Sequence, residues 1–285
     1  MKVKPVRIGL VAPGSPLEAD TARDLAALAA SLYPDGRVEL MFHPQCFLSH
    51  GHFAGDDGTR LAAFLEVAND PAIDAVWFAR GGYGAVRIAE AAMDGLRAAA
   101  ADKAYLGYSD AGTLLALLYS KGFGQVAHGP MGQDLRRSGG DEAITRALAW
   151  LVDRDAVALE GSVSPDVPAA AFNLTILSQL LGTPWEPDLA GHVLMVEEVS
   201  EHHYRIDRYF GHILSNPQMR RLAGLRLGRC SDIPENDRPF GMTEEEIARD
   251  WCARTGVAYL GRADIGHDAA NRVVPFGDAI RRPRR

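Results

Sequence analysis

The sequence predicts an α/β protein whose first half forms a parallel sheet covered by helices on both faces. Short apolar runs alternate with segments of helical periodicity from residue 6 to residue 130. The apolar runs are continuous rather than alternating, which is typical of strands buried on both faces. Glycine-rich corners at residues 80–84 and 107–110 follow two of these runs, at the edge where open parallel sheets bind ligands.

Each strand of this half is predicted from an apolar run, and each helix from the Ala- and Leu-rich or amphipathic spacing that follows. In chain order, the strands are expected at residues 6–13, 38–44, 72–80, 104–109 and 125–130. The helices between them are expected at residues 17–33, 60–69, 85–100 and 113–121. This alternation predicts one parallel sheet.

The organisation changes after about Asp134. A polar-faced helix is predicted at residues 136–147, and a stretch containing Pro165 and Pro168 indicates a linker. Beyond it the patterns predict helices at residues 170–184, 205–216 and 243–255, with strands at 192–199 and 221–230. We therefore divide the chain into a first domain at residues 1–155, a linker at 156–170 and a second domain at 171–285.

The composition excludes several classes of function. The 285 residues are 47% hydrophobic and carry a net charge of −7, which disfavours binding to nucleic acid or an anionic membrane. No run reaches the roughly 18–20 apolar residues of a membrane span. Cys46, Cys230 and Cys252 show no metal-ligand spacing, so we expect free thiols, no metal site and a cytoplasmic location.

A serine occupies the corner Gly107-Tyr108-Ser109-Asp110, between a predicted strand and a predicted helix. Such a corner can hold a hydroxyl above the sheet edge and aim the following amide, that of Asp110, at the same place. Position 111 is Ala, so the pattern of the α/β-hydrolase elbow is not met. A serine there can also simply cap a helix, and the corner alone leaves both interpretations open.

The corner Arg80-Gly81-Gly82-Tyr83-Gly84 leaves main-chain N–H groups unshielded by side chains. It matches neither common phosphate-loop pattern. A tight turn from strand to helix explains it equally well.

A base and a carboxylate for Ser109 have candidates in the second half. His267 lies in the loop at residues 263–277, although the chain has nine histidines and a lone loop histidine is commonly a surface residue. Glu197 and Glu198 end an otherwise apolar strand, and burying a carboxylate is costly unless it is paired. Strand alternation puts the two acids on opposite faces, so at most one should face a given histidine.

In their order along the chain, the motifs resemble the LD-carboxypeptidase family, which holds the murein tetrapeptide carboxypeptidases and the microcin-immunity peptidases. The resemblance runs through nearly the whole chain. The matching motifs are VAPGSP (residues 11–16), RGGYG (80–84), GYSD (107–110), HGPM (128–131), NL with LLGTP (173–184), EEVSEHHYRIDR (197–208) and IGH…N…PFG (265–277).

This resemblance implies a role for each matching residue. Ser109 corresponds to the family's nucleophile, Glu197 to the carboxylate of its triad and His267 to its base. The oxyanion hole corresponds to the amide of Asp110 and one amide of the pair Gly81 and Gly82. Arg80 and Tyr83 are our candidates for substrate contact.

The resemblance also implies the fold and the assembly. It predicts a flavodoxin-like N-terminal α/β sandwich and a smaller, β-rich C-terminal domain that donates the Glu and the His across a cleft. It further implies metal-free acyl transfer without a cofactor, and a homodimer.

The substrate stays open between two classes. One is the L,D amide bond to a terminal D-amino acid in murein peptides, and the other is the amide of a peptidyl- or aminoacyl-nucleotide. Two departures from the family pattern bear on this choice: residues 170–174 replace a Gly-Gly-Asn-Leu turn, and His202-His203 stand where a Pro often precedes Tyr204. A non-catalytic binding protein for a small ligand is the alternative from another class.

Overall fold

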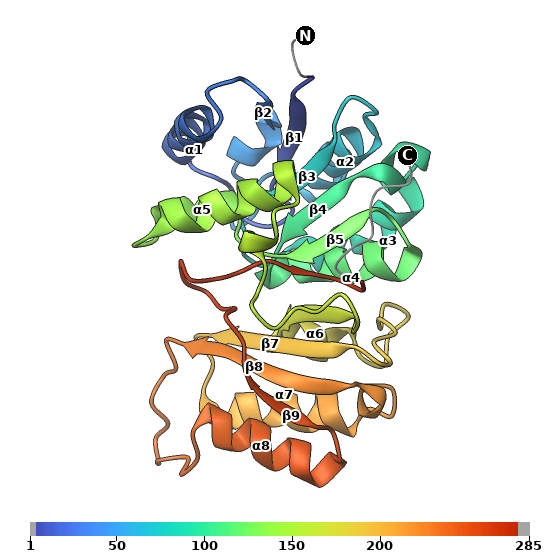
Figure 1. The fold of residues 1–285 in the computed structure, drawn as a ribbon, viewed down its shortest axis with the longest axis vertical. Coiled ribbons are helices and arrows are strands. Elements are labelled where there is room, and N and C mark those ends of the chain that lie inside the picture. Colours follow the sequence, from blue (N-terminus) through green and yellow to red (C-terminus); the bar gives the residue numbers. More distant parts are fainter. Residues whose placement is uncertain (1–3, 279–285) are drawn as a thin grey trace.

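The structure is a computed structural model that describes residues 4–278. Its first sheet has six strands in the order β10-β5-β4-β3-β1-β2, parallel except for β10 (Figure 1). These strands are β1 (Val6–Val11), β2 (Val38–Phe42), β3 (Ala75–Phe78), β4 (Ala104–Gly107), β5 (Gln125–His128) and β10 (Val274–Pro275). The predicted parallel α/β class is confirmed.

Helices cover both faces of this sheet, as the continuous apolar strands predict (Figure 1). One face is covered by α1 (Ala19–Leu32) and α5 (Gly140–Leu148). The other is covered by α2 (Asp57–Asn69), α3 (Ala85–Gly95) and α4 (Gly112–Lys121). Short helical turns join the elements: η1 (Pro44–Phe47), η2 (Ala98–Asp102), η3 (Ser109–Ala111), η4 (Gly132–Arg136), η5 (Ala149–Asp153), η6 (Ala156–Ala158) and η7 (Met219–Arg221).

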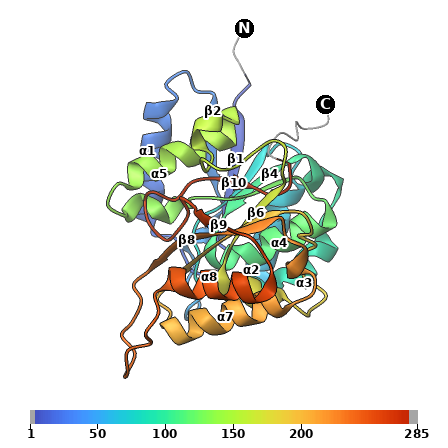
Figure 2. The ribbon, with the colours of Figure 1, turned by 60° about the horizontal axis from the view of Figure 1, so that its bottom comes forward.

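A second parallel sheet, in the order β6-β7-β8-β9, lies below the first in Figure 1. Its strands are β6 (Ala169–Asn173), β7 (Val193–Val199), β8 (Gly224–Ser231) and β9 (Tyr259–Arg262). The associated helices are α6 (Leu174–Leu180), α7 (His203–Ser215) and α8 (Glu244–Thr255). The segment between β8 and α8 projects from the body in Figure 2.

After β9 the chain returns to the first sheet. In β10, Val274 pairs with His128 and Pro275 with Ala127, antiparallel to β5. The apolar run around Pro275 indicates a strand, but its pairing with β5 was not predicted, because the partner lies in the other half of the chain. The return carries the loop at residues 263–273 from one sheet to the other, and that loop contains His267.

The prediction of one helix at residues 170–184 is wrong at its start. Ala169–Asn173 forms β6, buried at every position beside β7, and the helix α6 begins only at Leu174. The Asn173 side chain caps this helix by accepting a hydrogen bond from the Ile176 amide, 3.2 Å away. A short apolar run is compatible with either a buried strand or a helix, so periodicity could not separate them.

Other helix boundaries also differ from the expectation by a few residues. The helix α3 ends at Gly95 rather than at residue 100, and α5 begins at Gly140 rather than at residue 136. The helix α2 begins three residues early, because the carboxylate of Asp56 accepts a hydrogen bond from the Thr59 amide at 2.7 Å and caps it.

The two sheets share one apolar core. The helix α4 packs against α6, and Leu114 and Leu118 belong to the same buried cluster as Phe172 and Leu177. This shared apolar cluster holds the two halves of the chain together. Residues from both halves can therefore keep a fixed distance from one another.

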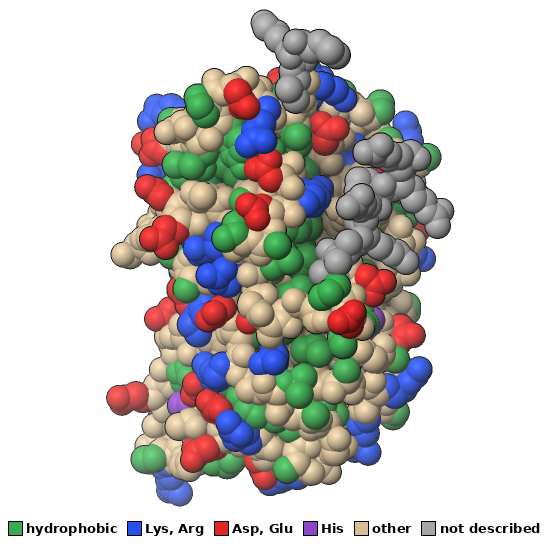
Figure 3. Space-filling model, viewed as in Figure 1, with side chains coloured by type: hydrophobic (Ala, Val, Ile, Leu, Met, Phe, Trp, Pro, Cys, Tyr) green, Lys and Arg blue, Asp and Glu red, His purple; other side chains and the backbone are tan. Residues whose placement is uncertain are grey.

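The surface carries charges of both signs. Lys and Arg are interspersed with Asp and Glu over the face shown in Figure 3. Of the helices within residues 4–278, none is long and apolar enough to cross a membrane.

We expect Leu25→Ala to lower the free energy of unfolding by about 2–5 kcal/mol, because the Leu25 side chain is fully buried between α1 and the first sheet. Leu32→Ala, on the same helix but 37% exposed, is the control and should cost under about 1 kcal/mol. Urea unfolding measures both. Equal costs would contradict the packing described for α1.

Candidate active site

The carboxyl ends of the parallel strands β1, β3 and β4 meet at one edge of the first sheet. The loops that follow them are the ones with the glycine and serine motifs. The amide of Ser15, in the loop after β1, donates to the carbonyl of Gly81, in the loop after β3, at 3.1 Å. The motifs that are separate in the sequence are therefore neighbours in space.

Ser109 stands directly beyond β4 and opens the turn η3 in a left-handed conformation, with φ +57°. A non-glycine residue in this region is strained, and such strain is typical of serines held at the corner between a strand and a helix. Gly81 lies against it: a Cβ atom at Gly81 would come within 3.3 Å of the Cβ and Oγ of Ser109. The glycine thus allows the main chain after β3 to approach the serine closely.

Asp110 links the serine corner to the glycine turn. Its buried carboxylate accepts a hydrogen bond from the Ala85 amide at 2.7 Å, at the N-terminus of α3, where the helix dipole favours a negative charge. Burial raises the pKa of Asp110 to about 6, against the lowering effect of the amides of Ala85 and Gly84. The side chain of Asp110 therefore holds the loop after β3 in place, while its own amide stays beside Ser109.

Arg60 joins two loops at the same edge of the sheet. No role for this residue was predicted from the sequence. Its fully buried guanidinium donates to the carbonyl of Pro13, after β1, and to that of Gly84, after β3, the latter at 2.8 Å. The ring of Phe53 lies 4.7 Å from the guanidinium carbon. An arginine on an amphipathic helix ordinarily points to solvent, so no local pattern could reveal this role.

His267 and Glu197 form the closest polar pair of the site. The Nδ1 atom of His267 lies 2.6 Å from Oε2 of Glu197, whose side chain is 0% exposed. A carboxylate can only accept, so the Nδ1 atom carries the proton and Nε2 is free to act as a base. Burial alone would lower the pKa of His267, but the charge and hydrogen bond of Glu197 outweigh it, and the pKa is raised.

The neighbouring acid, Glu198, faces elsewhere, as strand alternation predicts. Its carboxylate accepts hydrogen bonds from the Asn173 side chain at 2.7 Å and from the amide and hydroxyl of Thr175 at 2.9 and 2.8 Å. The Val199 amide donates to it as well. Burial raises the pKa of Glu198. Of the two adjacent acids, only Glu197 therefore contacts the histidine.

Tyr108 brings the two halves of the site together. It precedes Ser109, and its ring centroid lies 4.8 Å from that of His267. The serine is thus one residue away from a side chain in contact with the imidazole. In the part of the chain that the structure describes, the Ser109 hydroxyl makes no hydrogen bond to His267.

The expected substrate contacts flank the glycine turn. The guanidinium of Arg80 donates to the carbonyl of Pro16 at 2.9 Å, and Tyr83 is 52% exposed with its ring 6.2 Å from that of Phe53. The ring of His202 stacks on Tyr204. Within residues 4–278, no group of three His, Cys, Asp or Glu side chains could hold a metal ion.

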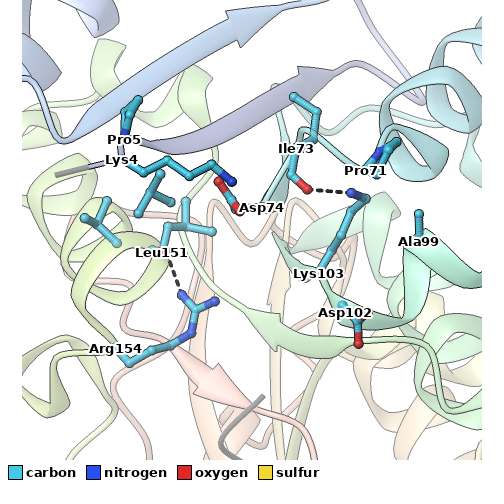
Figure 4. A pocket seen from close by; sticks show the side chains of 12 residues that line it. Lys4, Pro5, Pro71, Ile73, Asp74, Ala99, Asp102, Lys103, Leu151 and Arg154 are labelled. Carbon is cyan, nitrogen blue, oxygen red and sulfur yellow. Dashed lines mark hydrogen bonds between the residues drawn. The ribbon is translucent and has the colours of Figure 1, made fainter. Parts of the chain in front are cut away.

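A pocket of about 500 Å³ lies at the opposite, amino-terminal edge of the first sheet, lined by residues that precede β1, β3 and β4 (Figure 4). Its lining includes Lys103, which is buried, and Arg154, which is exposed. Lys103 donates to the carbonyls of Asp70 and Ile73, and Arg154 donates to the carbonyls of Trp150 and Leu151 within η5. Both cations are thus used by the main chain of the fold, and the pocket is separate from the serine edge.

A serine at a strand-to-helix corner, together with a histidine paired to a buried glutamate, supplies the residue types of a serine-hydrolase triad. Comparison with known proteins gives the family. The model of the LD-carboxypeptidase N-terminal domain matches residues 8–129, and that of its C-terminal domain matches residues 170–281. The chain therefore belongs to the LD-carboxypeptidase family and is a serine-type carboxypeptidase.

Individual relatives cover nearly the whole chain. The murein tetrapeptide carboxypeptidase of Pseudomonas aeruginosa is 27% identical over 95% of this chain and 91% of its own length. A protein of Synechocystis sp. is 30% identical, over 95% and 89%. The crystal structure of muramoyltetrapeptide carboxypeptidase from Oxalobacter formigenes has a TM-score of 0.75 at 25% identity, covering 95% and 92%.

The microcin C7 self-immunity protein MccF, in complex with aspartyl sulfamoyl adenosine, has a TM-score of 0.76 at 15% identity, covering 96% of this chain and 92% of its own. At this identity the likeness shows a shared fold.

The two adjacent acids can be separated by experiment. We expect Glu197→Gln to lower kcat by about 10⁴-fold with little change in stability, because the histidine loses the carboxylate that selects its tautomer. Glu198→Gln should instead cost about 1–3 kcal/mol of stability, because four donors converge on that carboxylate and an amide group cannot accept from all of them. Steady-state kinetics and urea unfolding report the two effects, and the reverse pattern would assign the site to Glu198.

Proposed function

We propose that the protein hydrolyses the L,D amide bond to a terminal D-amino acid in murein peptides, with Ser109, His267 and Glu197 as its triad. The observation that carries the proposal is the hydrogen bond between His267 and Glu197, beside the residue next to Ser109. The murein substrate is supported by the relative from Pseudomonas aeruginosa, a murein tetrapeptide carboxypeptidase.

In this mechanism the Nε2 atom of His267 takes the proton of the Ser109 hydroxyl as its oxygen attacks the scissile carbonyl. The buried carboxylate of Glu197 stabilises the imidazolium that forms. His267 then gives the proton to the leaving amine, which departs as the amino acid. Water hydrolyses the acyl-enzyme with the same histidine as base, and Ser109 is regenerated.

The negative oxygen of the tetrahedral intermediate would be held by the amide of Asp110 and by one amide of Gly81 and Gly82. Gly81 lies against Ser109, and across residues 4–278 the amides of Gly81 and Gly82 have no protein acceptor. Amides fixed before reaction stabilise developing charge without reorganisation. Arg80 and Tyr83, at the ends of the same turn, are proposed to contact the substrate.

A second candidate substrate is the amide of an aminoacyl- or peptidyl-nucleotide. It is favoured by the shared fold with MccF, and by the exposed ring of Tyr204, on which a base could stack. The triad would act on this amide in the same way, so only the substrate pocket differs between the two candidates.

Three expectations stay predictions: the cytoplasmic location, the homodimer, and the division of the chain at residues 156–170. The free thiols of Cys46, Cys230 and Cys252 are compatible with a reducing compartment.

We expect Ser109→Ala to lower turnover of a murein tetrapeptide by about 10⁴-fold or more, since no nucleophile remains. Ser120→Ala is the control, because the Ser120 hydroxyl only bonds the Ala116 carbonyl within α4. Mass spectrometry with tetrapeptide and aminoacyl-nucleotide substrates in parallel measures both. Near-full activity of Ser109→Ala would show that Ser109 is not the nucleophile. Absence of turnover of either substrate by the wild type, together with measurable ligand binding, would favour a binding protein.

The rate should depend on pH through the base. His267 must be neutral to accept the proton, and Glu197 raises its pKa. The acid limb of kcat/KM should therefore lie above the ordinary histidine pKa of about 6.5, with activity lost as the pH falls through it. In Glu197→Gln the limb should move to lower pH. A wild-type limb below 6.5 would contradict the pairing.

A further inference from the structure

We propose that His128 and Asn271 are positioning residues, a hydrogen-bonded pair that fixes the loop carrying His267. The inference rests on the proposed function, because it concerns the base of that reaction. His128 ends β5 in the first sheet, and Asn271 lies in the returning loop, 143 positions later. The two residues belong to the HGPM and IGH…N motifs, and neither residue has a role in the proposed reaction.

The contacts of Asn271 define the arrangement. Its side chain is 0% exposed, and its Oδ1 atom accepts a hydrogen bond from the Gly266 amide at 3.3 Å and lies 3.1 Å from Nε2 of His128. Gly266 immediately precedes His267 and has φ +158°, at the edge of the region that favours glycine. The main chain just before the base is thus tied to the end of β5.

The chemistry of these contacts fixes the protonation of His128. The Gly266 amide can only donate, so the atom of Asn271 that it meets is the oxygen. That oxygen can only accept from His128, so the Nε2 atom of His128 carries a proton. Burial lowers the pKa of His128 to about 4. The ring therefore stays neutral near pH 7 and donates without adding a charge beside the base.

Tyr108 completes the support. Its ring centroid lies 5.4 Å from that of His128 and 4.8 Å from that of His267, and its hydroxyl donates to Asp134 at 2.8 Å. His128 therefore supports His267 in two ways: through Asn271 and the main chain, and through the ring of Tyr108. Because Tyr108 also precedes Ser109, the same contacts set the relative position of nucleophile and base.

Fold stability alone does not explain Asn271. Within the described residues its Nδ2 atom is buried without a partner, and an unpaired buried donor destabilises a fold. An apolar side chain of similar size would avoid that cost, but it would leave the Gly266 amide and His128 unpaired. The residue is thus suited to orienting the loop.

The experiment compares His128→Leu, which removes the donor, with His128→Gln, whose amide can still donate to Asn271. In His128→Leu we expect kcat to fall about 10²-fold, as for a misplacement of about 1 Å, with a small change in KM. The acid limb of kcat/KM should move to lower pH, because a displaced His267 loses part of the pKa rise that Glu197 supplies. The other charged groups acting on His267 are Asp134 and Arg137, and neither is altered. His128→Gln should keep most of the wild-type kcat and most of the wild-type position of the acid limb.

The matched control is His192→Leu. His192 is also buried, and it bonds the Tyr119 hydroxyl at 2.7 Å, in contact with α4 rather than with the His267 loop. It should lower the unfolding temperature without moving the acid limb. If His128→Leu does the same, with an unchanged limb and kcat per folded molecule, the role is structural and the inference falls.

A measurement on the wild-type protein keeps the inference testable should His128→Leu not fold. Nitrogen-15 NMR should show His128 neutral with its proton on Nε2, and His267 protonated on Nδ1, at pH 7. A proton on Nδ1 of His128 would overturn the inference. Ser109→Ala distinguishes failure of this inference from failure of the proposed function. If Ser109→Ala is inactive while His128→Leu behaves like the control His192→Leu, the proposed function stands and only the positioning role is lost.

Discussion

The site depends on a single buried hydrogen bond, between the Nδ1 atom of His267 and a carboxylate oxygen of Glu197. The second oxygen of Glu197 is buried without a partner in the described part of the chain, so this charge is held with less compensation than buried carboxylates usually receive. Glu198 next to it accepts four hydrogen bonds. Glu198 therefore stabilises the fold through its four donors, whereas Glu197 acts mainly on His267, because a carboxylate bonded on all sides would have little effect on the histidine.

The chain crosses from the second sheet to the first just after the bond between His267 and Glu197. The loop that carries His267 leaves β9 in the second sheet and ends in β10, which pairs with β5 of the first. Glu197 is held by the second sheet and Ser109 by the first, while the apolar core shared by α4 and α6 keeps the two sheets together. A shift of one sheet relative to the other would therefore alter the distance between Ser109 and His267 before it altered the fold of either half.

Local pattern could predict most of the scaffold and the residues at its corners. Continuous apolar runs mark β1, β3 and β4 because a parallel sheet buries both faces of each strand, and the serine corner is visible because strand, Ser109 and helix are adjacent in sequence. The strand β6 was missed because three alanines, a phenylalanine and the polar cap Asn173 fit a helix equally well. Arg60, and the pairing of His128 with Asn271, were beyond local reasoning, since each acts through contacts with groups that are distant in the chain.

The support behind the site comes from polar groups that the reaction itself would not consume. Arg60 joins the loops after β1 and β3, the side chain of Asp110 caps α3, and Asn271 ties the loop of the base to β5. Each of them holds a buried polar or charged group in a hydrogen bond, at a desolvation cost that an apolar side chain would not carry. The three contacts converge on the position of Ser109, Gly81 and His267. Such convergence is expected where a rate depends on placing groups to within about 1 Å, and under the proposed function these contacts would set the position of Ser109 relative to His267.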